Sequence, residues 1–335
     1  MPRPLVSLVV TTVAMVLVAG CGSGGPPEAN GSGGGDAGEW TVLAYVDADG
    51  DLEDALIGDF NEMEVIGSTY SVNVVAQMDR HPAYDTTNGN WVTCRRFLVQ
   101  RDPSEPVVPQ DGQHNHIIVT PNITDIGEVN MGAEDTLVDF VEWGMTEYPG
   151  ERYFLVLVDH GWGWQPRSVG ARDVGVTTRG VMFDETSGMD SLSNAELKSA
   201  LQRIKAIRGK NLEILGLDAS EEALLEVAYQ VRDTVDYLVA SQLSEPNDGY
   251  PYDAILHRLD GNPTQSTETF LLGLLQDYLD SYEPGQHTTS AGSSVTLTVF
   301  REDRVAALAQ STDALAQALQ AELPGAAQDL VDIRT

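Results

Sequence analysis

Apolar segments of strand length alternate with segments of helical periodicity along most of the chain. Continuous apolar runs predict strands buried on both faces, whereas apolar residues three and four positions apart predict helices that cover a sheet. We expect strands at residues 40–47, 72–79, 96–99, 116–119, 153–159, 212–218, 235–240 and 294–300. Helices are expected at residues 52–65, 136–148, 193–207, 221–232 and 264–282, with a last helix from residue 301. This alternation predicts an α/β fold with a mainly parallel central sheet.

Polar side chains stand where several of these predicted strands end. They are Asp47, Asp79, Asp159, His160, Asp218 and Ser220. In a parallel sheet the carboxyl ends of the strands share one edge, and ligands bind in the crevice beyond that edge. We therefore expect these side chains to gather near a functional site.

The N-terminal segment has the pattern of an export signal. Arg3 supplies a positive charge, and the apolar run at residues 5–20 is shorter than the roughly 20 residues needed to span a bilayer. The run ends in Val-Ala-Gly before Cys21, which resembles the lipobox of bacterial lipoproteins. In that motif the cysteine is acylated and becomes the first residue of the mature protein, so Cys21 is the expected lipidation site. Ordinary signal cleavage with an unmodified cysteine is the alternative.

A segment rich in glycine and serine separates Cys21 from the first predicted strand. Such a composition cannot bury enough apolar surface to fold, and it predicts a flexible tether. The expected organisation is a lipoprotein signal peptide at residues 1–20, a tether at 21–39 and one domain at 40–335. The domain would lie outside the cytoplasm, with the lipid anchor as its only attachment to the cell membrane or the outer membrane.

The formal net charge of -32 limits the partners of this chain. Phosphates of nucleic acids and anionic lipid headgroups would be repelled, so we expect no nucleic-acid partner. Solubility outside the cell explains the charge simply, and attraction of basic peptides is the functional alternative. The chain has 2 cysteines, and acylation of Cys21 would leave Cys94 without a disulfide partner.

Acidic residues after the first strand resemble the start of a calcium-binding EF-hand loop, but the spacing does not fit. With Asp47 in the first position, the required glycine and bidentate glutamate would be Leu52 and Gly58. A cation site of carboxylate and carbonyl oxygens with a different spacing remains an alternative. Acids that are simply solvated in a loop are the simpler interpretation. The histidines lack the spacing of a zinc motif, and the sequence contains no phosphate-binding glycine loop. We therefore assign no metal ligands and no cofactor from the sequence.

His160 ends a predicted strand and is followed by Gly161-Trp162-Gly163-Trp164. Glycine permits close backbone approach and unusual dihedral angles, and the tryptophans could form the wall of a pocket. A single histidine at a strand end is more often structural than catalytic, so the wider pattern of the sequence decides its role.

Seven segments, among them YFLVLVDHGWGW and LEILGLDAS, carry a resemblance to a known family. They are residues 40–67, 72–80, 127–149, 153–164, 212–220, 225–242 and 245–256. In this order they resemble the clostripain-family cysteine peptidases, whose fold is the caspase-like three-layer sandwich. The resemblance covers most of residues 40–260 and implies that fold here. It also suggests a calcium ion, without naming residues that would bind it.

The resemblance implies roles for four residues. In the family the histidine of an Asp-His-Gly segment is catalytic, and here it is His160. The family's nucleophile is the cysteine of an Asp-Ala-Cys segment, where this chain has Ser220. Asp218, two residues earlier, is implied to bind a basic substrate side chain, and Asp248, in a second matching segment, is implied to face the same pocket.

Serine at position 220 changes the expected chemistry. A thiol is partly ionised at neutral pH, whereas a serine hydroxyl needs a base within hydrogen-bond reach and a group that orients this base. Ser220-Glu221-Glu222 also has the pattern of a helix N-cap followed by acids in the first turn. The negative charge of those carboxylates would oppose the positive electrostatic potential at the helix N-terminus, which favours an anionic nucleophile. We therefore interpret Ser220 as an N-cap in a degenerate peptidase site.

Three functions follow from this interpretation and its alternatives. The favoured expectation is a clostripain-like surface lipoprotein that has lost peptidase chemistry and binds a peptide or protein segment, with a basic side chain at Asp218. The enzyme alternative is an endopeptidase specific for Arg or Lys that uses Ser220 with His160. The third function is that of a structural envelope protein. The presence of His160 and Asp218 argues against it.

Overall fold

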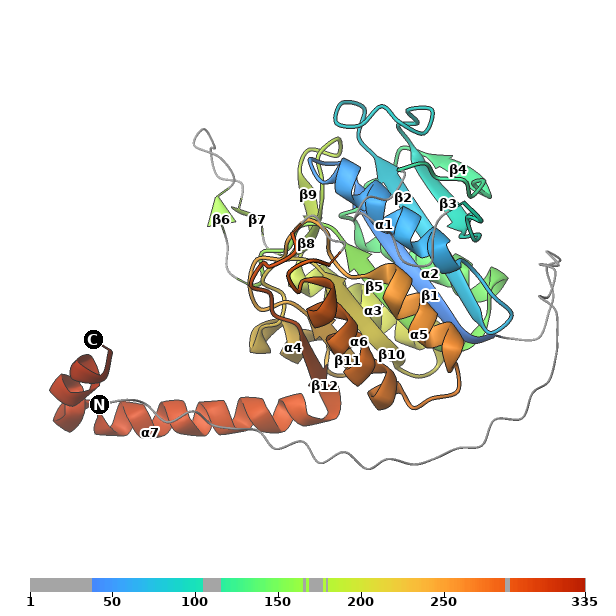
Figure 1. The fold of residues 1–335 in the computed structure, drawn as a ribbon. Helices are drawn as coiled ribbons and strands as arrows, with labels where there is room; N and C mark the ends of the chain where they lie inside the picture. Colours follow the sequence, from blue (N-terminus) through green and yellow to red (C-terminus); the bar gives the residue numbers. More distant parts are fainter. Residues whose placement is uncertain are drawn as a thin grey trace. The chain divides into compact units, whose positions relative to one another are not determined.

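An eight-stranded sheet forms the centre of the protein (Figure 1). The computed structural model describes residues 38–104, 116–164, 167–168, 177–178, 180–286 and 290–334. The strand order is β12-β11-β10-β5-β1-β2-β3-β4. The parallel strands are β11 (Val235–Ala240), β10 (Leu212–Asp218), β5 (Gly150–Val158), β1 (Gly38–Ala48) and β2 (Val72–Arg80). The two edges are completed by the antiparallel strands β12 (Thr298–Arg301), β3 (Cys94–Leu98) and β4 (Thr124–Gly127).

Helices cover both faces of this sheet and close two hydrophobic cores. Figure 1 shows one layer in front of the strands, formed by α1 (Glu53–Ile66), α5 (Tyr252–Gly261) and α6 (Thr267–Ser281). The other core is closed by α2 (Glu134–Glu147), α3 (Asn194–Arg208) and α4 (Leu225–Val231). The expected α/β three-layer sandwich with a mainly parallel sheet is confirmed.

Alternate side chains of β1 enter opposite cores, which explains its continuous apolar sequence. Val42, Ala44 and Val46 belong to the core beneath α1, while Leu43 and Tyr45 belong to the core beneath α2. All five are buried, because successive strand residues point to opposite faces and both faces are covered here. The same pattern makes the other central strands predictable from their apolar runs.

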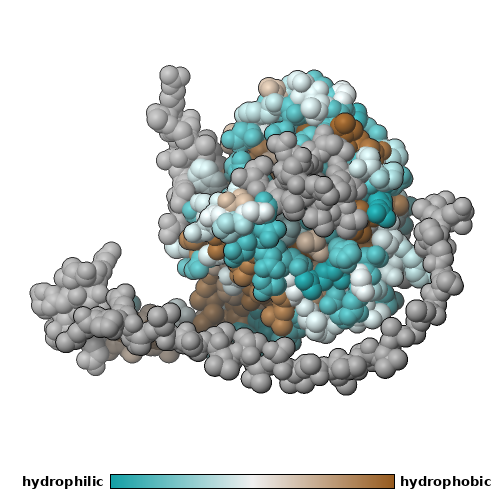
Figure 2. All heavy atoms as spheres, viewed as in Figure 1, coloured by the Kyte–Doolittle hydropathy of each residue, from teal (hydrophilic) through white to brown (hydrophobic). Residues whose placement is uncertain are grey.

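Smaller elements lie outside the central sheet. They include the hairpins of β6 (Arg167–Ser168) with β7 (Thr177–Thr178) and of β8 (Val181–Asp184) with β9 (Asp190–Leu192), and the last helix, α7 (Glu302–Arg334). Val305 in the first turn of α7 is buried, whereas Leu308, Leu315 and Leu319 are exposed. In Figure 2 hydrophilic residues cover most of the visible described surface, and a hydrophobic group lies near the start of this helix. The first turn of α7 therefore joins it to the core.

The predicted capping box at the start of α3 is confirmed. The Ser193 hydroxyl accepts a hydrogen bond from the Glu196 amide, and the Glu196 carboxylate accepts one from the Ser193 amide. Two backbone donors at the helix start are satisfied in this way. Gly209, in the left-handed conformation, ends the same helix.

At the N-terminal end, β1 begins at Gly38 and therefore includes two residues of the expected tether. The predicted signal peptide, Cys21 and the rest of the tether lie outside the described residues. Among the residues that the structure describes, no helix is both long and apolar enough to cross a bilayer.

Some predicted elements differ from the structure. Residues 116–119 form no strand, because the amides of Val119 and Thr120 donate to the Glu64 carboxylate at 3.0 and 2.7 Å. The strand expected at 294–300 is confined to Thr298–Arg301, and the helix expected at 264–282 begins only at Thr267. The preceding helix α5 was not predicted, although its buried residues Tyr252, Ile255, Leu256 and Leu259 have helical spacing. The hairpin strands were not predicted either, since runs of two to four residues are too brief to show a period.

Candidate functional site

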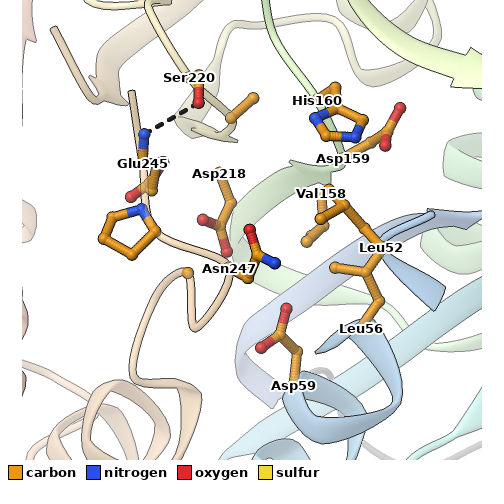
Figure 3. A pocket seen from close by; sticks show the side chains of 13 residues that line it. Leu52, Leu56, Asp59, Val158, Asp159, His160, Asp218, Ser220, Glu245 and Asn247 are labelled. Carbon is orange, nitrogen blue, oxygen red and sulfur yellow. Dashed lines mark hydrogen bonds between the residues drawn. The ribbon is translucent and has the colours of Figure 1, made fainter. Parts of the chain in front are cut away.

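A pocket opens beyond the carboxyl ends of β5 and β10, at the edge where ligands are expected in a parallel sheet. The start of α1 and the loop after β11 complete its wall (Figure 3). Its volume is about 160 Å³. We call it the central pocket, and its described lining residues are Leu52, Leu56, Asp59, Val158, Asp159, His160, Asp218, Ala219, Ser220, Glu245, Pro246, Asn247 and Gly249.

Asp218 ends β10 and is held firmly in this pocket. One carboxylate oxygen accepts hydrogen bonds from the Tyr252 hydroxyl at 2.6 Å and from the Tyr250 amide at 3.1 Å. Burial raises the pKa of Asp218 to about 6, and the two hydrogen bonds oppose this rise. Gly249 is required beside it, because its φ is 53° and a Cβ there would lie 2.9 Å from the carboxylate.

Two further acids, Asp59 on α1 and Glu245 in the loop after β11, face the same cavity (Figure 3). One carboxylate oxygen of Asp59 is buried without a hydrogen-bond partner. Burial raises the pKa of both carboxyl groups, and the nearby charge of Asp218 raises it further. None of the described residues that line the pocket is a lysine or arginine. A cationic side chain entering the cavity would therefore relieve the repulsion among these acids.

His160 follows β5 and is oriented by an acid from another loop. Its Nε2 lies 2.8 Å from Oδ1 of Asp51, between β1 and α1. The preceding Asp159 is buried and accepts a hydrogen bond from the amide of Phe183 in β8. Burial raises the pKa of Asp159 to about 7, and the neighbouring imidazole opposes this rise. Hydrogen bonds thus connect the end of β5 to the loop between β1 and α1 and to the β8–β9 hairpin.

Ser220 also lines the central pocket, but the predicted N-cap role is wrong. The next helix, α4, begins at Leu225, and its N-cap residue Leu224 makes no side-chain cap. The Ser220 Oγ instead accepts a hydrogen bond from the Glu245 amide at 2.9 Å (Figure 3). No hydrogen bond joins the two described side chains of Ser220 and His160. The hydroxyl therefore fixes the loop that carries Glu245, and the imidazole does not accept its proton.

The acids after Ser220 do not lie in a helix, contrary to expectation. Glu221 has a φ of 63°, which is rare for a residue other than glycine and turns the chain away from helical geometry. The buried Glu222 carboxylate accepts hydrogen bonds from the amides of Trp162 at 3.0 Å and Gly163 at 2.9 Å. These hydrogen bonds fix the loop after β5, and burial raises the pKa of Glu222 to about 7. Since no helix begins at Ser220, the predicted effect of these acids on a helix N-terminus does not arise.

Comparison with known proteins decides the family of the chain. The model of the clostripain family matches residues 44–332. This chain belongs to the clostripain family. Clostripain of Hathewaya histolytica is 25% identical over 244 residues, which make up 70% of this chain and 44% of that protein. The chain thus spans less than half the length of this relative.

Solved structures share the clostripain-family fold of this chain. A secreted C11 cysteine protease from Bacteroides thetaiotaomicron, in complex with an irreversible peptide inhibitor, has a TM-score of 0.61 and 21% identity. That alignment covers 84% of this chain and 71% of the protease. An inactive zymogen C11 protease from Parabacteroides distasonis has a TM-score of 0.57 and 19% identity over 82% of this chain and 65% of its own. These likenesses confirm the fold expected from the resemblance.

Two residues considered in the sequence analysis lie outside the described lining of the central pocket. Asp248, implied to face the pocket, accepts a hydrogen bond from the Ser290 amide at 3.0 Å. Its charge nevertheless contributes to the raised pKa of Asp59. Cys94 is buried in β3, and burial raises the pKa of its thiol. It is therefore not positioned to replace a nucleophile at Ser220.

Sequence reasoning missed Asp51, Asp59 and Glu245. Asp59 carried a usable signal, because it lies on the same helical stripe as Leu56 and Met63, where an apolar residue is expected. Asp51 and Glu245 lie in loops, and only the folded chain brings their side chains to His160 and Asp218.

Two of the three acids around the end of β1 are not solvated, so the simpler interpretation of this loop is wrong for them. Asp47 is 1% exposed and Asp49 is 0% exposed, whereas Asp51 is exposed. The Asp49 amide donates a hydrogen bond to Asp47 Oδ1 at 3.2 Å, as in an Asx turn. These two carboxylates are therefore buried, and Asp47 interacts electrostatically with Asp159 of the central pocket.

Proposed function

We propose that this clostripain-family chain has lost the cysteine nucleophile of a peptidase and binds peptide or protein segments. The central pocket would accept a basic side chain of the ligand. The supporting observation is the set of carboxylates on Asp59, Asp218 and Glu245 around a cavity whose described lining has no lysine or arginine. A guanidinium or ammonium group would give these acids charge-assisted hydrogen bonds.

The arrangement at Ser220 favours binding over hydrolysis. Its hydroxyl is engaged by the Glu245 amide, while the His160 imidazole is engaged by Asp51. A serine nucleophile depends on direct proton transfer to a base, in contrast to a thiol that ionises readily. The hydrogen bonds in this pocket therefore support a binding site that lacks an activated nucleophile.

We also propose that the protein is an exported lipoprotein acylated on Cys21. The support is the N-terminal sequence, with its positive residue, apolar run and Val-Ala-Gly-Cys end. The related Bacteroides thetaiotaomicron protease is described as secreted. In cells, the full chain should partition with membranes, and Cys21→Ala should release it into the soluble fraction. Membrane association that survives Cys21→Ala would exclude this anchor.

A second candidate is an endopeptidase specific for Arg or Lys that uses Ser220 with His160, because both side chains line one pocket. Fluorogenic Arg and Lys peptides distinguish the two candidates when assayed with the full chain, Ser220→Ala and Ser220→Cys. We expect no turnover by the wild type. Wild-type turnover that disappears in Ser220→Ala would overturn the binding proposal. Turnover only in Ser220→Cys would show an intact pocket that lacks its nucleophile.

Binding is tested separately with a fluorescent peptide that carries one arginine, compared with the same peptide carrying neutral citrulline. Asp218→Asn should weaken binding of the arginine peptide about 100-fold, because the buried charge partner is lost. Asp248→Asn removes a nearby acid outside the described lining and should weaken binding much less. Equal affinity for arginine and citrulline peptides would exclude a pocket selective for basic side chains.

A further inference from the structure

A second pocket, with a volume of about 320 Å³, is formed by three segments that also line the central pocket. These segments follow β5, β10 and β11. On each of them, a residue that lines the second pocket lies within two positions of a residue that lines the central pocket. The two pockets are therefore neighbours, since consecutive Cα atoms are about 3.8 Å apart. The described lining residues of the second pocket are Trp162, Trp164, Glu221, Leu224, Gln242, Leu243 and Ser244.

The lining of the second pocket is mainly apolar. Two tryptophans and two leucines contribute to it, and Trp164 is 44% exposed while Leu243 is 50% exposed. Among the described lining residues, Glu221 alone carries a charge. Exposed apolar side chains that gather around one cavity, with a few polar groups at its edge, are typical of a binding site. The lining therefore differs in kind from the acids of the central pocket.

The wall that carries the tryptophans is held by the protein itself. The buried Glu222 carboxylate accepts hydrogen bonds from the amides of Trp162 and Gly163, and the Trp162 ring packs on Phe183 with ring centroids 5.7 Å apart. Gly163 has a φ of 58°, and a Cβ there would lie 2.7 Å from the Leu224 side chain. Glycine therefore lets the loop after β5 pack closely against the segment after β10. These contacts form the wall without any ligand.

Two hydrogen bonds fix the second pocket relative to the central pocket. The Glu245 amide donates to Ser220 Oγ at 2.9 Å (Figure 3), and the Glu221 amide donates to the Leu243 carbonyl at 3.1 Å. Both bonds join the segment after β10 to the loop after β11. A peptide with a basic side chain in the central pocket would thus bring a side chain one or two positions away to the second pocket.

We propose that the second pocket binds an apolar side chain of the same peptide segment, within two positions of the basic residue. This inference rests on the proposed binding function and adds a sequence preference to it. An apolar side chain would remove the exposed surface of Trp164 and Leu243 from water, which supplies affinity without desolvating a charge.

A second basic side chain is the competing occupant of this pocket. It could stack on a tryptophan ring beside the Glu221 carboxylate. The lining has two tryptophans and two leucines but one carboxylate, so an apolar side chain fits it better. The central pocket, in contrast, offers three carboxylates to a cation, those of Asp59, Asp218 and Glu245.

Fluorescent peptides that bind to the full chain test this preference. Four peptides combine arginine or citrulline at the centre with leucine or serine at the two positions on each side. We expect leucine to strengthen binding of the arginine peptide about tenfold or more, because burial of one leucine side chain supplies that much affinity. Equal affinity of the leucine and serine peptides would overturn the proposal. A peptide with lysine at the same positions tests the competing occupant. Tighter binding of this peptide than of the leucine peptide, lost in Trp164→Ser, would also overturn the proposal.

Leu243→Ser locates the preference in the second pocket. It should remove most of the advantage of the leucine peptide, while the Leu243 backbone carbonyl that bonds to the Glu221 amide is kept. Leu272→Ser is the matched control, because Leu272 lies on α6, is 65% exposed and is not part of the described lining. Equal loss in the two variants would indicate unspecific adsorption of apolar peptides and overturn the assigned pocket.

A measurement without a basic group separates this proposal from the proposed binding function. In NMR spectra of the full chain, N-acetylleucine amide at about 10 mM should shift the indole N–H resonance of Trp164, because uncharged ligands of this size bind in the millimolar range. Trp164→Phe assigns that resonance by its loss, and N-acetylserine amide should leave it in place.

The two proposals can therefore fail separately. Equal affinity for arginine and citrulline peptides, together with a shift of the Trp164 resonance, would exclude the basic side chain in the central pocket and keep the apolar pocket. A Trp164 resonance that N-acetylleucine amide does not move would overturn the apolar pocket, whatever the peptides show.

Discussion

The central pocket and a second group of acids, formed by Asp49, Glu128 and Asp184, differ in how their carboxylates are spaced. In the central pocket, carboxylates surround a cavity of about 160 Å³. In the second group, carboxylate oxygens lie within 4.8 Å of one another. A guanidinium or ammonium group with its alkyl stem needs a cavity such as that of the central pocket. Spacing, more than net charge, therefore distinguishes the proposed site for a basic side chain from the second group of acids.

The two sites also differ in how their acids are supported. Asp218 has two dedicated donors, the Tyr252 hydroxyl and the Tyr250 amide. Asp49 and Glu128 share the single hydroxyl of Thr186. A carboxylate with its own donors stays oriented without a ligand, whereas carboxylates that share one hydroxyl proton are oriented less firmly. The comparison predicts a preformed central pocket and a less firmly held loop after β1.

Glycine substitutions provide the largest test of this difference. A Cβ at Gly161 would lie 2.5 Å from the Ser220 carbonyl oxygen, because the loops of the central pocket pack backbone against backbone. Gly161→Ala should lower the free energy of unfolding by about 3 kcal/mol, measured by urea denaturation. At Gly50, in the loop after β1, the nearest atom to a Cβ is 3.9 Å away.

Gly50→Ala is therefore the matched control and should change stability by less than about 0.5 kcal/mol. Similar losses in both variants would contradict the view that the central pocket is the more tightly packed of the two sites. If Gly161→Ala lowered the free energy of unfolding only slightly, the loops around Ser220 would be able to separate. The pocket would then not be preformed.

The sequence predicted the parts of the fold that depend on local pattern. Apolar runs located β1, β2, β5 and β10, because strands buried on both faces need apolar side chains at every position. Since parallel strands end at one edge, the acids Asp47, Asp79, Asp159 and Asp218 could be expected there before any contact was known.

The errors arose where a loop takes its structure from a distant partner. Ser220 and Glu222 have the local pattern of a helix start, but Ser220 accepts a bond from Glu245 and Glu222 accepts bonds from the loop after β5. A capping pattern is a local preference, and long-range hydrogen bonds prevailed over it. The buried state of Asp49 was equally hidden, because the hairpin that covers it is remote in sequence.

The pH dependence of peptide binding gives the next largest effect. Asp218 has a pKa raised to about 6, so below that pH it is neutral and attracts a basic side chain weakly. Affinity for the arginine peptide should fall up to tenfold per pH unit below about 6, which corresponds to about 1.4 kcal/mol per unit. The citrulline peptide, measured in the same titration, should show a much flatter profile.

The same raised pKa has the opposite effect on the stability of the free protein. A carboxyl group with a raised pKa in the folded state binds its proton more tightly there than in the unfolded chain. Asp218 therefore stabilises the fold below its unfolded pKa, and this contribution is lost as the pH rises through about 6. Peptide affinity that increases as the pH falls below 6 would contradict the assignment of Asp218 as the charged partner.

Tyr252→Phe has the smallest expected effect and tests the dedicated donors of Asp218. It removes the hydroxyl that bonds to the carboxylate at 2.6 Å and favours its charged form. The pKa of Asp218 should rise, so the midpoint of arginine-peptide binding should move to higher pH by roughly one unit, equivalent to about 1.4 kcal/mol. Tyr250→Phe is the control, because the Tyr250 hydroxyl bonds to the carbonyls of Leu217 and Val239 and the amide bond to Asp218 is kept. An unchanged midpoint in Tyr252→Phe would mean that water replaces the lost donor, and the pocket would then be less rigid than its hydrogen bonds indicate.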